Sequence, residues 1–437
     1  MDIHIDKDEL HKIQELQRTQ KASDRVLVAD FIAFEDVPTD PAKPLSSPTG
    51  QKRPHPSPLP RLDPISHVLR FNTPWMCSDA NGSRQSTRKY SLQPTERLHQ
   101  EIVDFANYVS PTEEERFARS EAIKRLSEVV TALWTDASVQ VFGSFDSQLF
   151  LPSSDLDVVV VVPSLAETIL DEYSKPPLNK LAKALLKAEV PVPESLQVIT
   201  KARVPIVKYM DNRTDFEIDI CFNVLSGLEA AKFMQTEMKR QPAVRPLTLV
   251  LKYFLQMRAL NTVFHGGLGS YTIMCLVISF LQMHPLVQSG MIRAHENLGV
   301  LLMELFELYG RNHNSETVGI NVKEGGSYYH KEDLGFAQEA KPHLLSIMDP
   351  QNENNDIAKG SFAYGPVKQS FEHAFNVLKC AILEFESHLQ KNADDTRRPT
   401  KEKHPSVETV PSLLGSIITL DPKLLRHRYY IQQTANL

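Results

Sequence analysis

The sequence predicts an α+β protein in which two ordered lobes follow a disordered N-terminal arm. Three observations support this fold class: a proline-rich opening, a group of short apolar strands between residues 139 and 222, and helical spacing of apolar residues from 246 to 389. We expect a β-rich lobe at about 123–239, a helical lobe made of 91–122 and 240–390, and a polar, basic tail over 391–437.

Composition bounds the class of protein. Of the 437 residues, 41% are apolar and 23% are charged, which excludes collagen-like and wholly disordered chains. No apolar run reaches the roughly 20 residues that span a bilayer, and no charged-then-apolar leader follows Met1, so neither membrane insertion nor secretion is expected. The net charge of -6 argues against non-specific coating of nucleic acid but leaves room for a local basic groove. The cysteines are scattered singly, which excludes a CxxC zinc site in this chain and fits a reducing compartment: Cys77, Cys221, Cys275 and Cys380.

The first 90 residues are expected to form the disordered arm. Between Pro38 and Pro64 one residue in three is proline, and such a segment buries too little apolar surface to offset chain entropy. Within the arm, residues 26–37 form an apolar island edged with acids. Two interpretations stay open: chance hydrophobicity in a tail, or a short motif that folds onto a partner.

Two helices are expected at the start of the ordered part, at 95–108 and 112–133, because apolar residues recur there at helical spacing. Thr112 is suited to cap the second helix, and the three glutamates that follow sit at the positive end of its dipole. Four strands are expected next, at 139–142, 157–162, 198–207 and 216–222. Beyond them the periodicity is helical and includes helices at 246–260 and 271–283.

Three carboxylates carry the chemistry that the sequence suggests. Asp155 and Asp157 open the valine-rich strand, and side chains two apart on a strand share a face. Asp219 lies on the alternating strand 216–222, and it completes a three-carboxylate cluster if the two strands are neighbours. Such a cluster suits Mg²⁺, and two bridged cations clamp the attacking and leaving oxygens of an in-line displacement.

Gly143 and Ser144 lie shortly before the acids, with ten residues between Ser144 and Asp155. The glycine permits a sharp exit from the strand, and we expect Ser144 to cap a short helix at 145–149 whose N–H groups seat a triphosphate. A lone DxD also occurs in calcium loops and ordinary turns. The combination of strand, Gly-Ser, DxD and a downstream acid is far more specific.

Residues 141–157 (VFGSFDSQLFLPSSDLD) resemble the signature of the DNA polymerase β-like nucleotidyltransferases. Further segments resemble the non-canonical poly(A) polymerases of the TRAMP type, nuclear enzymes that tail RNA for exosome decay or processing: 202–208, 219–223, 249–252, 266–271, 297–302, 349–350 and 354–356. The resemblance covers about 92–380. It implies a nucleotidyltransferase palm, with a mixed sheet and helices, and a helical central domain that recognises the base.

The resemblance also implies roles for individual residues. Asp155, Asp157 and Asp219 would hold Mg²⁺ or Mn²⁺, with Asp219 nearest the RNA 3′-hydroxyl. On the nucleotide, Ser144 and Lys252 would hold the β- and γ-phosphates. A second interpretation of Lys252 stays open, because a lysine on an apolar helix can also lie at its edge and extend its ammonium into water. The ribose, base and remaining phosphate contacts would come from Asn223, Gly227, Ser270 and Tyr271.

Base choice is expected from the loop 349–359. Uridylyl-adding relatives carry histidine where the spacing from Asp349 places Asn355, so the asparagine favours ATP. Two positions depart from the family pattern: Lys359 replaces an arginine, and Ser226 replaces the asparagine before Gly227. Asn223 has a second interpretation, as a turn former at the end of a strand.

The leading hypothesis is therefore an RNA adenylyltransferase that adds AMP from ATP to RNA 3′ ends in the nucleus or nucleolus. The alternatives are a uridylyl- or mixed-nucleotide tailing enzyme, a catalytically silent scaffold, and a small-molecule transferase of the same superfamily. No RRM, KH or zinc-knuckle signature is present, which predicts a partner that supplies RNA binding. By resemblance that partner is a zinc-knuckle subunit on the helical lobe, and the island at 26–37 would dock the exosome-cofactor RNA helicase.

Overall fold

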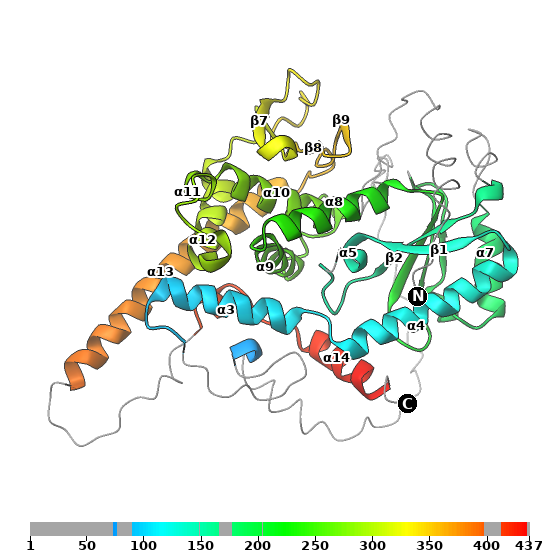
Figure 1. The fold of residues 1–437 in the computed structure, drawn as a ribbon, viewed down its shortest axis with the longest axis horizontal. Helices are drawn as coiled ribbons and strands as arrows, with labels where there is room; N and C mark the ends of the chain where they lie inside the picture. The colour runs from blue at the N-terminus through cyan, green and yellow to red at the C-terminus, as the bar shows by residue number, and fades with distance from the viewer. Residues whose placement is uncertain are drawn as a thin grey trace, which may run out of the picture.

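The computed structural model describes residues 73–76, 90–147, 149–165, 177–202, 204–396 and 412–434. The predicted docking island at 26–37 lies outside the described residues. The ordered chain forms a β-rich lobe and a helical lobe. On one side of the molecule, α3 (Pro94–Val109) runs along the helical lobe and α4 (Glu113–Leu133) along the β-rich lobe (Figure 1). Among the described residues, no helix combines the length and the apolar character needed to cross a bilayer.

The β-rich lobe is built on a five-stranded mixed sheet with the order β1-β2-β5-β4-β3. Only β2 and β5 run parallel, and the other neighbours are antiparallel. The strands are β1 (Ser138–Phe142), β2 (Leu156–Val161), β3 (Gln197–Ile199), β4 (Ile206–Met210) and β5 (Glu217–Phe222). The single strand expected at 198–207 is wrong, because Pro205 lacks the N–H that a continuous ladder needs and the chain turns back there as a hairpin.

One face of this sheet is covered by α4 and α7 (Leu178–Lys187), whose apolar stripes meet the inward residues of the strands in one core. The predicted cap of α4 is confirmed: Thr112 Oγ1 accepts a hydrogen bond from the Glu115 N–H, and the Glu115 carboxylate accepts one from the Thr112 N–H. The opposite face carries a smaller apolar cluster, which leaves the ends of β2 and β5 for polar side chains.

The helical lobe has a larger core to which most helices contribute. Its α-helices are α3, α8 (Ser226–Arg240), α9 (Val244–Gln256), α10 (Ser270–Met283), α11 (Pro285–Gln288), α12 (Leu298–Glu307) and α13 (Tyr364–Thr396). Its short helices are η1 (Pro74–Met76), η3 (Val263–His265), η4 (Ala294–Glu296), η6 (Lys323–Gly325), η8 (Leu414–Ser416) and the π-helical η5 (Leu308–Asn312), whereas η2 (Pro193–Ser195) lies beside β4 in the β-rich lobe. Two hairpins lie on this lobe: β6 (Val318–Asn321) with β7 (Ser327–His330), and β8 (Met348–Asp349) with β9 (Asn352–Asp356).

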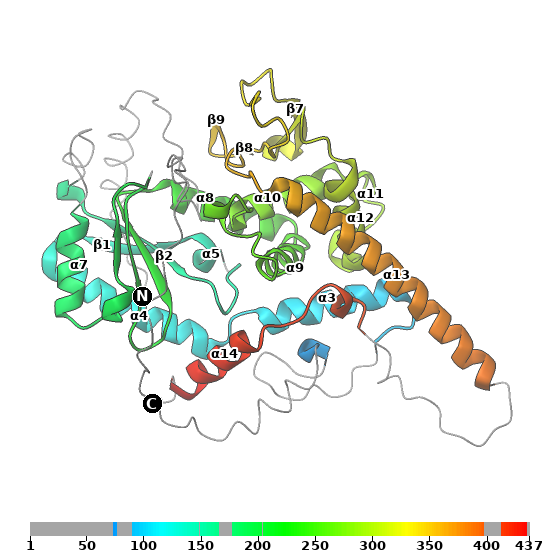
Figure 2. The same ribbon diagram turned by 180° about the vertical axis from the view of Figure 1, so that it is seen from behind.

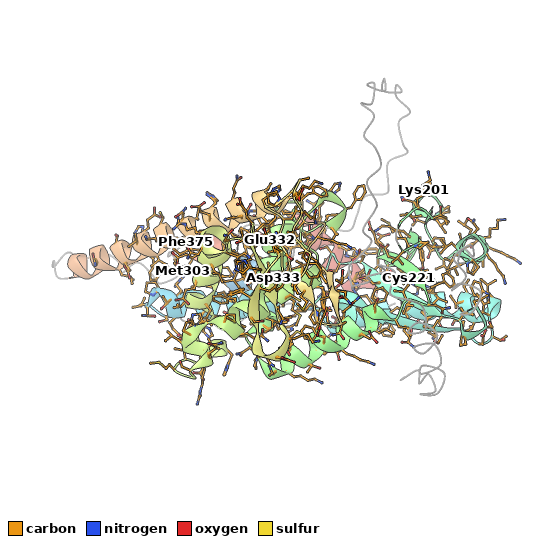
Figure 3. The ribbon with its side chains drawn as sticks, turned by 90° about the horizontal axis from the view of Figure 1, so that it is seen from above. Lys201, Cys221, Met303, Glu332, Asp333 and Phe375 are labelled. Carbon is orange, nitrogen blue, oxygen red and sulfur yellow. The ribbon has the colours of Figure 1, made fainter. Side chains whose placement is uncertain are left out.

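The lobe boundaries differ from those expected from the sequence. The expected break at 122–123 falls inside α4, whose Ala118 and Ala122 already belong to the core of the β-rich lobe. At the other end α8 packs against both lobes: its buried residues Ala230, Ala231 and Met234 belong to the helical core, and the helix also contacts α5 (Gly143–Asp146) and β1. Figure 3 separates the lobes from above, with Lys201 and Cys221 in the β-rich lobe and Met303 and Phe375 in the helical one.

The expected polar tail over 391–437 is wrong for residues 412–434. These residues form η8 and α14 (Pro422–Thr434), which lie beside α3 and α4 (Figure 2). Leu414 and Ile418 are buried in the helical core, whereas Ile431 is buried in the core of the β-rich lobe. Within the expected arm, residues 73–76 are described and pack on the helical lobe, where Trp75 is buried with its ring edge-on against Phe105.

Candidate active site

The three predicted carboxylates meet at one end of the sheet. Asp157 lies on β2 directly opposite Asp219 on β5, because these parallel strands pair in that register. Asp155 precedes β2 by one residue. Ligand oxygens of all three side chains lie within 4.8 Å of one another, so the cluster expected from the sequence is present. The register of β2 and β5, with the residue before β2, therefore places three carboxyl groups in one small volume.

Burial and mutual repulsion shape the electrostatics of this cluster. Burial, together with the nearby Asp155 charge, raises the pKa of Asp219 to about 7 from its usual 3.8. Lys208 on β4 opposes this shift, since its Nζ lies 3.2 Å from Asp219 Oδ1 and 2.8 Å from Glu217 Oε2. Those carboxylates in turn raise the pKa of the Lys208 ammonium, which stays charged.

The donor set fits a hard divalent cation. It consists of carboxylate oxygens alone, the ligands that Mg²⁺ and Mn²⁺ prefer. All three side chains are partly buried, and holding several carboxylates together away from water is costly, so a bound cation would offset that cost. A bound cation would also oppose the burial and the Asp155 repulsion that together raise the pKa of Asp219.

Two predicted glycines owe their identity to close packing around this cluster. Gly143 begins α5 (Gly143–Asp146) with φ of 68°, and a Cβ there would lie 2.4 Å from Asp157 Oδ2. Gly227 lies in the first turn of α8, where a Cβ would lie 2.5 Å from the ring of Phe142. Gly143 thus lets the backbone approach Asp157 on β2, and Gly227 lets α8 approach Phe142 at the end of β1, which is an additional reason for both glycines beside any nucleotide contact.

Ser144 does not cap the short helix. The N-cap position belongs to Phe142, and α5 ends at Asp146 rather than 149, so the expected capping role is wrong. The Ser144 side chain is 2% exposed, and its Oγ has no hydrogen-bond partner within the described part of the chain. A buried unsatisfied hydroxyl is costly, and a bound polar ligand such as a phosphate would satisfy it.

Lys252 and the acidic cluster are linked through the helix α9. Lys252 is 6% exposed, so it is not an edge residue that snorkels. One turn later, Gln256 Nε2 donates a hydrogen bond of 2.8 Å to Ser153 Oγ, in the loop that leads to Asp155. Sequence reasoning missed Gln256, and it gave no role to Lys208, although strand alternation next to Asp219 was a signal that could have found the lysine.

A second group of predicted residues gathers in the helical lobe. Ser270 and Tyr271 begin α10 and are both buried. Asn355 Nδ2 donates to Asp349 Oδ2 at 2.9 Å, while Asn355 Oδ1 is buried without a hydrogen-bond partner among the described residues. Burial raises the pKa of Asp349 to about 6. The negative charge of Glu229, in the first turn of α8, raises the pKa of Asp349 further. Because α8 follows β5 in the chain, it connects this group with the strand that carries Asp219.

Asn223 and Lys359 are less directly placed for a ligand. Asn223 lies at the end of β5, where its amide accepts from the Val162 N–H at 2.8 Å and donates to the Val162 carbonyl at 3.2 Å. Its φ of 51° agrees with the turn-forming interpretation. Lys359 follows β9 in the loop that joins Asn355 to α13. The ribose and base contacts expected of these two residues stay predictions.

Family comparisons agree with this geometry. A family model described as "Poly(A) RNA polymerase, mitochondrial-like, central palm domain" matches residues 98–237, and one described as "Cid1 family poly A polymerase" matches residues 297–355. The chain resembles the solved structure of the polymerase core of TRAMP, a RNA surveillance complex, with a TM-score of 0.65 and 35% identity over 79% of this chain and 98% of that one. The Cid1 poly(U) polymerase, with a TM-score of 0.54 at 19% identity over 65% of this chain and 94% of that one, shares the fold.

Curated relatives give the same assignment. The chain is 39% identical to Poly(A) RNA polymerase cid14 of Schizosaccharomyces pombe, over 76% of this chain and 46% of the relative. It is 37% identical to Poly(A) RNA polymerase protein 2 of Saccharomyces cerevisiae, over 74% of this chain and 54% of the relative. A Drosophila melanogaster relative named "Inactive non-canonical poly(A) RNA polymerase protein Trf4-2" is 35% identical, over 64% of this chain and 67% of the relative. The chain thus spans about half the length of the first two relatives, and it belongs to the family of non-canonical poly(A) RNA polymerases of the TRAMP type.

Proposed function

We propose that this chain is a template-independent RNA adenylyltransferase. In the reaction, the RNA 3′-hydroxyl oxygen bonds to the α-phosphorus of ATP, the bond from that phosphorus to the β-bridging oxygen breaks, pyrophosphate leaves, and the hydroxyl proton passes to water. The observation that carries the proposal is the approach of Asp155, Asp157 and Asp219 to within 4.8 Å. Phosphoryl transfer depends on positioning and charge stabilisation, and this cluster is built for both.

The residues of this chain have separate tasks in that reaction. The three aspartates would hold Mg²⁺ or Mn²⁺, which when bound polarises the α-phosphate and neutralises charge on the attacking and leaving oxygens. Ser144 and Lys252 would bind the β- and γ-phosphates: the serine offers a buried hydroxyl and the lysine a buried ammonium. Ser270 would contact the phosphates beside them. Tyr271 would stack on the base, which supports affinity for any nucleotide.

Selection of ATP is proposed to rest on Asn355. An ionised Asp349 only accepts hydrogen bonds, so it holds the Nδ2 amide group and leaves Asn355 Oδ1 as an acceptor. Adenine presents its N6 amino donor to such an acceptor, whereas the O4 of uracil and the O6 of guanine are acceptors themselves. Asn223, Gly227 and Lys359 would complete the ribose and base contacts.

The RNA class and the partners are proposed from the family. The TRAMP core with 35% identity belongs to a RNA surveillance complex, so we infer that this chain tails nuclear RNAs for exosome decay or processing. A zinc-knuckle RNA-binding subunit would dock on the helical lobe, and an RNA helicase would be recruited through residues 26–37. Deleting residues 1–40 should abolish recovery of the helicase in a pull-down, and unchanged recovery would remove the docking role.

One experiment tests the activity. The purified chain, with and without a zinc-knuckle partner, is incubated with a labelled RNA primer and each nucleoside triphosphate singly, in parallel with Asp155→Ala/Asp157→Ala. We expect ATP-dependent ladders that the double variant lacks. A preference for UTP would instead support the uridylyl or mixed-nucleotide alternative, and modification of a small molecule would place the chain elsewhere in the superfamily.

A silent scaffold is the second candidate function. The Drosophila relative at 35% identity is named inactive, so family membership does not by itself establish turnover. The complete carboxylate cluster of this chain supports the active alternative. No extension with any nucleotide, in a protein that binds Mn²⁺ and the zinc-knuckle partner, would favour the scaffold.

A further inference from the structure

We propose that Arg119 is a positioning residue that sets the place of Asp155 in the metal site. This inference rests on the proposed role of the acidic cluster in binding a divalent cation. Arg119 lies on α4, outside the motifs that carry the family resemblance in the sequence. Its guanidinium reaches the loop between α5 and β2, the segment that delivers Asp155 to the cluster.

The contacts of Arg119 fix the backbone immediately before Asp155. Nη2 donates a hydrogen bond of 3.2 Å to the Pro152 carbonyl and one of 2.7 Å to the Ser154 carbonyl. The Ser154 carbonyl belongs to the peptide unit whose nitrogen is that of Asp155, so this bond orients the residue directly. From the other side, Gln256 holds Ser153 through its side-chain hydroxyl. The loop is thus held by a residue from each lobe.

The guanidinium itself is held in place by aromatic rings. Arg119 is fully buried, and its Cζ lies 4.7 Å from the ring centroid of Phe150 and 4.1 Å from that of Phe216. Its Nε and Nη1 donate to no described residue, so burial leaves part of its hydrogen-bonding capacity unused. Such burial is unfavourable, and it lowers the pKa of Arg119 to about 10, while Glu115 and Asp155 act in the opposite direction. The arginine stays cationic at neutral pH and adds a fixed positive charge that acts on Asp155.

The C-terminal helix supports this arrangement from behind. Glu115, one turn before Arg119 on α4, is engaged by Arg428 of α14, whose Nε and Nη2 donate to its two carboxylate oxygens at 2.8 and 3.1 Å. Glu115 therefore forms its ion pair with Arg428. The ring of His427 meets Phe216 edge-on at 5.3 Å, and Phe216 is one of the two rings that hold Arg119. The C-terminal helix thereby fixes both the helix and the ring on which Arg119 depends.

These contacts use properties that only arginine has. A planar guanidinium lies over two aromatic rings while one nitrogen reaches two carbonyls, whereas a lysine ammonium is compact and strongly hydrated. Arg119→Lys keeps the charge but loses the stacking and the fixed reach. Arg97 provides a matched control in the helical lobe, because it is 1% exposed, lies over the rings of Tyr90 and Phe385, and pairs with Glu101.

The test measures metal binding separately from catalysis. The metal-free full chain, Arg119→Lys and Arg97→Lys are titrated with Mn²⁺, the free ion is quantified by electron paramagnetic resonance, and Asp155→Ala identifies the signal of the cluster. Residues that orient metal ligands typically change metal affinity by about 10–100-fold, so we expect a loss in that range for Arg119→Lys. Arg97→Lys should bind Mn²⁺ as the unaltered chain does. Phe150→Leu, which removes one stacking ring and keeps an apolar side chain, should weaken Mn²⁺ binding to a smaller extent.

The outcomes separate this inference from the proposed activity. Equal Mn²⁺ affinity in Arg119→Lys and Arg97→Lys would overturn the positioning role. If Arg119→Lys fails to fold, Phe150→Leu takes its place, and an unchanged Mn²⁺ affinity in that variant would overturn the role as well. Loss of Mn²⁺ affinity in a chain that extends no primer would support Arg119 while rejecting the adenylyltransferase. In an active chain, the Mn²⁺ concentration for half-maximal extension should rise in Arg119→Lys by the same factor as the dissociation constant.

Discussion

Asp157 and Asp219 lie directly opposite one another on β2 and β5, the only parallel neighbours in the five-stranded sheet of the described chain. Parallel pairing places both carboxylates on one face and at the same end of the sheet, because side chains in register point the same way. Asp155 extends the pair from the loop before β2. The acidic centre therefore depends on strand register, and removing the disfavoured charge of Asp219 should lower catalysis while it stabilises the metal-free fold.

Asp219→Asn tests this opposition. We expect primer extension to fall by roughly 10³-fold, since one anionic ligand of the metal site is lost. The melting temperature of the metal-free protein at pH 8 should rise, because the fold disfavours the ionised form of Asp219 and a neutral amide avoids that cost. Thermal denaturation and a primer-extension assay measure the two effects. Retained extension would contradict the assignment of Asp219 to the metal site.

The stability of the metal-free protein should depend on pH through Asp219. The folded state raises its pKa from 3.8 to about 7, so folding is coupled to proton uptake. The free energy of unfolding should therefore rise as pH falls from about 7 towards about 4, the interval between the folded and the unfolded pKa of Asp219. Added Mg²⁺ should stabilise the protein more at pH 8 than at pH 6, since the metal binds the deprotonated form. Asp219→Asn should lose the pH dependence of this window, and an unchanged slope in that variant would assign it to another group.

Gly143→Ala should damage the site through sterics alone. An alanine Cβ would lie 2.4 Å from Asp157 Oδ2, and the φ of 68° is unfavourable for any side chain. We expect a loss of at least ~1 kcal/mol in the free energy of unfolding and a larger relative loss of extension rate. Gly365→Ala is the control, because a Cβ at that position would meet no atom within 4 Å. Equal rates in the two variants would show that Asp157 tolerates displacement.

Asn355→His should change the choice of nucleotide. It removes the acceptor that Asp349 orients and places a ring nitrogen there, so the ratio of ATP to UTP incorporation should fall by roughly 10-fold or more, about 1–3 kcal/mol. Competition assays with both nucleotides measure the ratio. Asn352→His, on the exposed part of the same strand β9, should leave the ratio unchanged. A similar ratio in both variants would remove Asn355 from base selection.

The buried pair Glu115–Arg428 should dominate the attachment of the C-terminal helix. Arg428→Met leaves the Glu115 carboxylate buried without its partner, which should lower the free energy of unfolding by about 3–5 kcal/mol. The double variant Glu115→Leu/Arg428→Met should recover much of that loss. Arg116→Met, which breaks an exposed pair with Glu113, should cost less than ~1 kcal/mol. Denaturant unfolding measures all three, and additive losses in the double variant would argue against coupling.

The sequence predicts local structure correctly where the pattern lies within a few residues. The capping box of Thr112 and Glu115, the amphipathic helices and the valine-rich strand β2 follow from patterns that short segments carry by themselves. The Gly-Ser and DxD spacing located the acidic end of that strand. The expected cap at Ser144 and the continuous strand at 198–207 failed because their outcome depended on neighbours that the local pattern does not contain.

The candidate residues of the acidic site can be found along the chain without a structure: three acids and a Gly-Ser turn, each marked by its own neighbours. Their combination into one site follows from folding alone, because the pairing of Asp157 with Asp219 depends on strand register between segments about 60 residues apart. The environments of Arg119 and Arg428 also follow from folding alone, because their partners lie far away along the chain. The buried charge of each arginine is stable only where specific carbonyls, carboxylates and rings surround it.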